Sequence, residues 1–141
     1  MSESEILRKI AVIFVTDVVG FSTLMAQNEE LTLRSFRSCK EILDNLFEEH
    51  TGRIFNTAGD SVLAEFPSAV SAVICAVEFQ KLIKARNASV NKEAQMQFRI
   101  GLNMGDVIIE GTNLYGDGVN VAARLEALSQ AGGVCLSKSI H

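Results

Sequence analysis

A run of branched apolar side chains near the start of the chain limits the possible folds more than any other feature. Every residue from Ile10 to Val15 is apolar. A run of this length and composition is typical of a central strand that is covered on both faces of its sheet. The run stops at Thr16 and Asp17. We therefore expect a sheet built around this strand, with a carboxylate at its carboxyl end.

The rest of the chain alternates between the apolar spacing of helices and that of strands. The expected elements are, in order, a stretch that looks helical after Gly20 and has clear helical spacing at residues 30–50, a hairpin at 53–66, a helix from 68 to 82 or 83, a hairpin at 96–110 that turns at 105–106, a helix at 119–128 and a short strand at 134–136. This order favours an α+β fold, and specifically a ferredoxin-like α/β sandwich, in which the helices lie on one face of the sheet.

The composition describes a single domain over residues 1–141 and argues against several classes of function. With 48% hydrophobic residues and one proline, the chain is not a disordered tail. Its net charge of −4, without a basic cluster, argues against a nucleic-acid partner. No signal peptide or membrane segment is recognisable, and three scattered cysteines fit a reducing compartment, so we expect a cytoplasmic protein. The last strand has no closing element after it, which we interpret as a domain truncated at its C-terminus.

Two aspartates stand where strands are expected to end. Asp17 follows the buried run, and Asp60 follows Gly59 in the turn of the first hairpin. Singly, such residues are more often a helix cap and a turn residue. Two carboxylates on neighbouring strand ends are, however, the smallest protein contribution to a Mg²⁺ site that phosphate oxygens and water complete. Gly20 lets the backbone come close to such a ligand.

A polar pair on the last expected helix suggests contact with a phosphate. Asn120 and Arg124 are four residues apart and so share one helix face. An arginine there can give a fixed fork of donors to a phosphate, and the neighbouring amide can position a sugar oxygen. The alternative is an ordinary solvent-exposed helix face. The glycine-rich stretch at residues 114–118 favours a helix that begins beside a ligand.

Four segments, taken together, resemble the successive motifs of class III nucleotidyl cyclases, the adenylyl and guanylyl cyclase catalytic domain. They are FVTDVVGFS at residues 14–22, NTAGDSVLAEF at 56–66, RIGLNMGD at 99–106 and YGDGVNVAARLE at 115–126. Four motifs in the family order are far more specific than any one of them. The resemblance implies conversion of ATP, with GTP as the alternative, to the 3′,5′-cyclic monophosphate and pyrophosphate.

The resemblance also implies a metal and triphosphate site. Asp17 and Asp60 match the two aspartates that bind a pair of Mg²⁺ or Mn²⁺ ions, and Val18 matches a residue whose carbonyl joins the coordination. The positions that match the triphosphate-binding amides are Val19, Gly20, Phe21 and Ser22.

Catalysis and assembly follow from the same resemblance. Asn120 matches the asparagine that orients the ribose, and Arg124 matches the arginine that stabilises charge at the α-phosphate. The family pairs two domains head to tail. We therefore expect a homodimer with shared active sites, each with aspartates from one subunit and the asparagine and arginine from the other.

The positions that select the base depart from the family pattern. Where the family uses a lysine and an aspartate to read adenine, this chain has Asn56 and Asn113. A neutral amide can donate or accept a hydrogen bond, so the choice between ATP and GTP stays open. The same departure motivates a second hypothesis, a nucleotide-binding or dimerising regulatory module without turnover. A diguanylate-cyclase-like or polymerase-palm-like domain is a more distant alternative, because the paired-glycine acidic hairpin of the former is absent.

Overall fold

The computed structural model describes residues 6–141. Its elements are β1 (Leu7–Val18), α1 (Phe21–Gln27), α2 (Glu29–Glu49), β2 (Arg53–Ala58), β3 (Ser61–Phe66), α3 (Ala69–Ala88), the 3₁₀ turn η1 (Lys92–Ala94), β4 (Phe98–Glu110), β5 (Asn113–Tyr115), α4 (Asp117–Leu128) and β6 (Val134–Leu136). The strands form one sheet in the order β2-β3-β1-β4-β5, with β6 pairing to β4. The α+β class is confirmed.

Strand β1 lies at the centre of the sheet, as its apolar run predicts. It pairs antiparallel with β3 on one side and with β4 on the other, so that Phe14 faces Ala64 and Leu102. The strand is longer than expected, because pairing with β4 continues as far as Val18. Asp17 therefore lies within β1, paired with Arg99 of β4, rather than after the strand.

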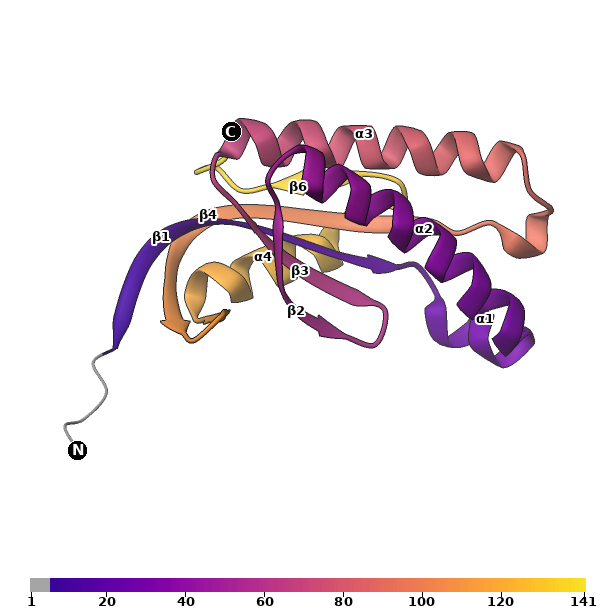
Figure 1. Cartoon of the computed structure of the whole chain (residues 1–141), viewed down its shortest axis with the longest axis horizontal. Helices are drawn as coiled ribbons and strands as arrows, with labels where there is room; N and C mark the ends of the chain where they lie inside the picture. Colours follow the sequence, from indigo (N-terminus) through magenta and orange to yellow (C-terminus); the bar gives the residue numbers. More distant parts are fainter. Residues whose placement is uncertain (1–5) are drawn as a thin grey trace.

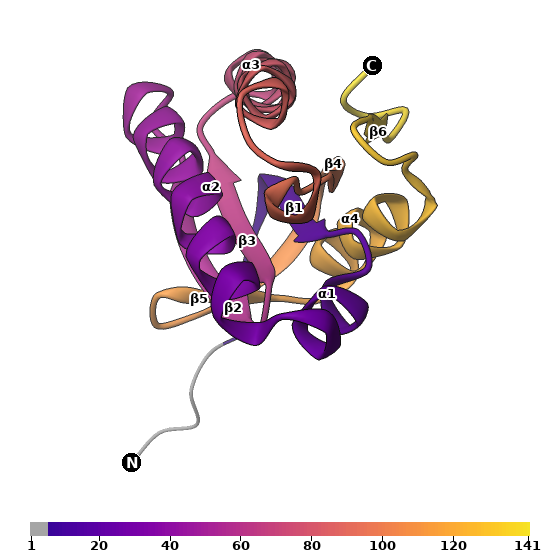
Figure 2. The same ribbon diagram turned by 90° about the vertical axis from the view of Figure 1, so that its right-hand side faces the viewer.

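Helices cover both faces of the sheet, so the expectation that they share one face is wrong. α2 and α3 pack on one face, around a core that contains Phe14, Phe47 and Phe79. α4 packs on the other face, where Ala122 meets Ile13 and other odd-numbered residues of β1. Figures 1 and 2 show the sheet between these two layers. The physical reason is that β1 presents apolar side chains in both directions.

The second hairpin turns later than expected. β4 runs without interruption through Gly105 and Asp106, because β1 still pairs with both of these residues. The chain turns instead at Gly111, whose φ of 62° suits glycine, and returns as β5. Gly105 allows a close approach: a Cβ on it would lie 3.3 Å from the Cα of Gly118 in α4.

The helices also differ in their bounds from the sequence pattern. The segment after Gly20 is divided at Asn28, whose extended backbone ends α1 and whose side chain accepts a hydrogen bond from the Leu31 amide at the start of α2. α3 begins after Ser68, as expected, but continues to Ala88. Within residues 6–141, no helix combines the length and the apolar character that a membrane crossing requires.

The three thiols differ in exposure, and this predicts which of them reacts. Cys39 and Cys75 are fully buried, and burial, followed by the nearby negative charges, raises the pKa of Cys75 to about 12. Cys135 is partly exposed on β6. We expect iodoacetamide at pH 8 to add one group to the folded protein, at Cys135, and three groups in urea, because only exposed thiols react as thiolates. Peptide mass spectrometry locates the adduct; native labelling of Cys75 would contradict the packing.

Candidate active site

The turn between β2 and β3 meets the end of β1 at one rim of the sheet. Asp60 follows Gly59, whose φ of 59° permits the tight turn between β2 and β3. The Asp60 Oδ2 accepts a hydrogen bond of 2.9 Å from the backbone amide of Val18. Since Val18 directly follows Asp17, the two predicted metal-binding aspartates occupy the same rim.

The carboxylate of Asp17 is incompletely satisfied. Its Oδ1 is buried and has no hydrogen-bond partner among residues 6–141. A buried oxygen of this kind is unfavourable unless a donor or a cation reaches it. Carboxylate oxygens are ligands that Mg²⁺ and Mn²⁺ prefer. The residues at this rim therefore fit a divalent ion.

A third acid, Glu126, lies in the same cluster, although we did not select it from the sequence. It is on α4 and 6% exposed. The pKa of Glu126 is raised to about 8, first by burial and then by a hydrogen bond with the Asp17 side chain and the negative charges of Asp17 and Asp60. The positive charge of Arg99 opposes this shift. The sequence did contain a signal: with Gly118 and Ala122, Glu126 continues the buried face of a helix at intervals of four residues.

The position of Glu126 follows from how closely α4 packs on β4. A Cβ on Gly101 would lie 2.3 Å from the Glu126 backbone nitrogen and 2.4 Å from the Ala122 oxygen. Only glycine allows this approach. At the other end of the helix, the buried Asn103 side chain donates to the Gly118 carbonyl at 2.9 Å. Two contacts with β4 thus fix the helix.

The structure does not bring Asn120 and Arg124 to the acid cluster of the same chain. Both side chains are exposed, whereas Glu126 is buried. At about 100° per residue, Arg124 points roughly 200° around the helix from Glu126. The candidate site therefore has two halves on opposite sides of α4.

Sequence comparison assigns the chain to a family. A profile described as "Adenylate and Guanylate cyclase catalytic domain" matches residues 3–141. The chain belongs to this family. "Putative adenylate cyclase 3" of Rhizobium meliloti (strain 1021) is 44% identical over 142 residues, which cover 100% of this chain and 24% of that protein. The chain thus spans about a quarter of the length of this curated relative.

Solved structures of cyclases share the fold. The "Adenylate/Guanylate Cyclase/Hydrolase from Silicibacter pomeroyi" matches with a TM-score of 0.87 and 37% identity, over 97% of this chain and 80% of that one. The adenylyl cyclase CyaB from P. aeruginosa matches with a TM-score of 0.83 and 26% identity, over 97% and 81%. The resemblance in the four motifs is therefore confirmed, and the chain is an adenylate and guanylate cyclase catalytic domain.

The predicted triphosphate-binding turn of this cyclase domain leads into α1. Gly20 has a φ of 66° and precedes the helix, which has no side-chain cap. The first amides of a helix lack intrahelical acceptors, so those of Phe21 and Ser22 are open to an anion. The amide of Val19 is engaged instead, because it donates to the Gln97 carbonyl at 2.8 Å. Val19 therefore contributes less to this turn than the sequence suggests.

The two base-selecting positions of the cyclase domain lie on β2 and β5. Asn56 is exposed beside an irregularity in the β2–β3 register. Asn113 is partly buried and already hydrogen-bonded: its Nδ2 donates to the Tyr115 hydroxyl at 3.0 Å, and its Oδ1 accepts from the next backbone amide at 2.8 Å. Sequence alone did not indicate this partner of Asn113.

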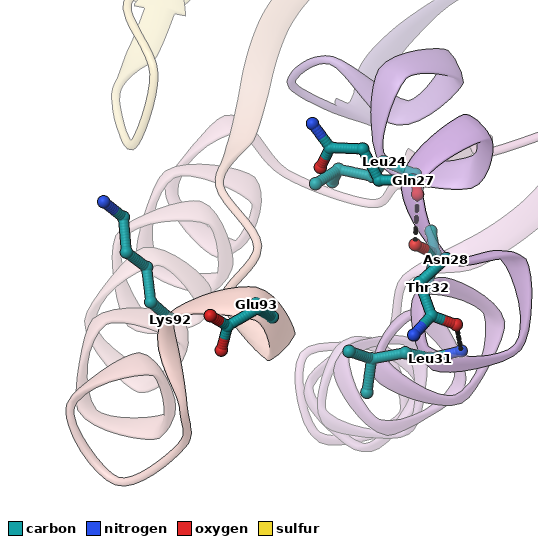
Figure 3. A pocket seen from close by; sticks show the side chains of 7 residues that line it. All are labelled: Leu24, Gln27, Asn28, Leu31, Thr32, Lys92 and Glu93. Carbon is teal, nitrogen blue, oxygen red and sulfur yellow. Dashed lines mark hydrogen bonds between the residues drawn. The ribbon is translucent and has the colours of Figure 1, made fainter.

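A hollow of about 560 Å³ lies away from these residues. Figure 3 shows it between the junction of α1 with α2 and the turn η1. Its lining residues are Leu24, Gln27, Asn28, Leu31, Thr32, Lys92 and Glu93. None of the predicted site residues lines this hollow.

Proposed function

We propose that the chain is the catalytic unit of a nucleotidyl cyclase that acts as a head-to-tail homodimer and converts ATP to 3′,5′-cyclic AMP and pyrophosphate. One observation carries this proposal: the acids Asp17 and Asp60 meet at one rim, while Asn120 and Arg124 lie exposed on the outer side of α4. One chain carries both halves of the site without joining them. A second copy in head-to-tail orientation supplies the missing half to each.

The metal half comprises Asp17, Asp60 and the Val18 carbonyl. The unpartnered Asp17 Oδ1 supports this assignment. Two Mg²⁺ or Mn²⁺ ions held there would lower the pKa of the ribose 3′-hydroxyl and neutralise charge on the departing pyrophosphate. The Val18 amide, by binding Asp60 Oδ2, keeps the two carboxylates on one rim.

The partner's half positions the nucleotide and stabilises charge. Arg124 offers the α-phosphate a guanidinium group, and a cationic donor of this kind is commonly worth about 3 kcal/mol in the transition state. Asn120, one helical turn away on the same face, holds the ribose in line for attack. The open amides of Phe21 and Ser22, in the same chain as the aspartates, bind the outer phosphates.

Base selection is expected to be weak. Asn56 and Asn113 carry no charge, and the Asn113 amide is held by Tyr115. A neutral amide discriminates between purines less strongly than a charged pair does. ATP is the proposed substrate because the curated relative at 44% identity is named an adenylate cyclase, and GTP is the competing one.

The test is the mass of the product. Purified protein is incubated with Mn²⁺ and either ATP or GTP, and the products are identified by mass spectrometry. We expect cyclic AMP, together with cyclic GMP at a rate within about tenfold. If folded, dimeric protein yields neither product while nucleotide still raises its melting temperature, the second candidate, a regulatory module without turnover, replaces the enzyme. The bonded state of Asn113 is the observation that favours this second candidate.

A further inference from the structure

Glu126 is an acid buried without a compensating group. It is 6% exposed, yet among residues 6–141 no cationic side chain forms an ion pair with it and no amide or hydroxyl group donates to its carboxyl. Carboxylates are rarely buried unless they are paired or bind a metal. The neighbour that it does reach is another acid, Asp17.

The fold holds Glu126 in this position. The Glu126 backbone nitrogen packs so closely on Gly101 that no side chain fits between them. Gly101 lies on β4, two residues beyond Arg99, and Arg99 pairs across the ladder with Asp17. Because α4 is fixed against β4, Glu126 cannot move away from Asp17 through a shift of the helix.

The charges at this rim are unbalanced. Asp17 from β1 and Asp60 from the β2–β3 turn both act on Glu126 of α4, and Arg99 of β4 is the cation that opposes them there. Arg99 forms no ion pair with any of them among residues 6–141. Three carboxyl groups thus share this rim with one guanidinium, and a divalent cation would offset that excess of acidic groups.

We propose that Glu126 is a third acidic residue of the metal site, and that the chain binds one divalent cation at Asp17, Asp60 and Glu126 before any nucleotide arrives. The proposal rests on the proposed function in assigning Asp17 and Asp60 to metal. Glu126 acts as a positioning residue: its carboxyl group lies against that of Asp17 and, once a cation is bound, adds negative charge at the site. The Asp17 Oδ1, which is buried and has no hydrogen-bond partner among residues 6–141, is a geometric sign that the cluster lacks a ligand.

A second group of side chains provides the internal comparison. Glu49, His50 and Glu78 offer ligand atoms within 4.8 Å of one another where α2 ends beside α3. His50 and Glu78 already contact each other at 3.3 Å, and of the three residues only Glu49 is exposed, whereas His50 and Glu78 are partly buried. A cation bound by the chain could therefore occupy either place, and variants separate the two.

The test measures Mn²⁺ binding without nucleotide, by the electron paramagnetic resonance signal of free Mn²⁺. Compared with the wild type, Glu126→Gln is expected to raise the Kd for Mn²⁺ about tenfold or more, which is the range found when groups that orient metal ligands are removed. Glu126→Asp, which keeps the charge, is expected to raise it less. Glu78→Gln and the exposed-acid control Glu110→Gln are expected to leave the Kd unchanged.

Thermal unfolding separates a metal-site role from a structural one. In EDTA, Glu126→Gln is expected to melt no lower than the wild type, because it removes one acid from a crowded cluster. Mn²⁺ is expected to raise its melting temperature less than that of the wild type. If Glu126 were purely structural, its substitution would lower the melting temperature in EDTA and the affinity for Mn²⁺ together.

Three results would overturn the proposal: no Mn²⁺ binding by the wild type without nucleotide, an unchanged Kd in Glu126→Gln, or a loss confined to Glu78→Gln. These outcomes are distinct from failure of the proposed function, which shows as absence of cyclic product when nucleotide is added. The chain can bind Mn²⁺ through Glu126 and still be inactive, or be active with a Glu126 that Mn²⁺ binding does not need.

Discussion

An equimolar mixture of the Asp17→Asn and Arg124→Ala proteins is expected to produce cyclic nucleotide at about a quarter of the wild-type rate, although each protein alone is inactive. In a head-to-tail dimer, every site takes its aspartates from one chain and its arginine from the other. Half of the randomly formed dimers are mixed. In each mixed dimer, one of the two sites combines an intact Asp17 with an intact Arg124.

The large loss in each single variant has a physical cause. Asp17→Asn removes a metal-binding charge, and Arg124→Ala removes a cationic donor whose loss costs about 3 kcal/mol, or roughly 100-fold to 1,000-fold in rate. The measurement is product formation over time, after the two proteins have been mixed long enough to exchange subunits.

A matched mixture serves as the control. Asp17→Asn mixed with Asp60→Asn has both lesions in the metal half, so no mixed dimer contains an intact site. This mixture is expected to stay inactive. Recovery in the control, or none in the first mixture, would rule out shared sites. The comparison depends on the exposed position of Arg124 on α4, away from the acids of its own chain.

The central part of the fold was predictable because a continuous apolar run in a strand is stable only when both faces of the strand are covered. The apolar run from Ile10 to Val15 requires cover on both faces, and β1 is indeed the central strand. The same run also argues against helices on a single face, because its apolar side chains point to both sides of the sheet. The turn expected at Gly105 was wrong because long-range pairing with Ala11 keeps that glycine extended, and local sequence does not report a partner about ninety residues away.

The site was predictable only in part for a related reason. The proximity of Asp17 and Asp60 follows from strand ends that meet at one rim, and the structure places them there. Glu126 was not predicted because Arg124, two residues before it, placed the expected site on the exposed side of the helix. Its burial depends on Gly101, which lies on a different element. The chemical roles of these residues remain predictions.

The substitution Gly101→Ala is expected to impair both stability and activity, because α4 carries Arg124 on one side and Glu126 on the other. The new methyl group would lie 2.3 Å from the Glu126 nitrogen and 2.4 Å from the Ala122 oxygen. Both are backbone atoms, so no rotamer change relieves the clash. The helix must shift, and overpacking of this kind costs about 1–3 kcal/mol.

The effect on activity should exceed the effect on stability. A displacement of about 1 Å is enough to reduce catalysis roughly 100-fold, and here it moves a residue of each half-site at once. Urea unfolding and the rate at saturating ATP with Mn²⁺ measure the two effects. Gly20→Ala is the control for stability: its Cβ meets no atom within 4 Å, and only its φ of 66° is unfavourable, so it should lose about 1 kcal/mol. A Gly101→Ala protein as stable and as active as the wild type would show that α4 does not lie against β4 as described.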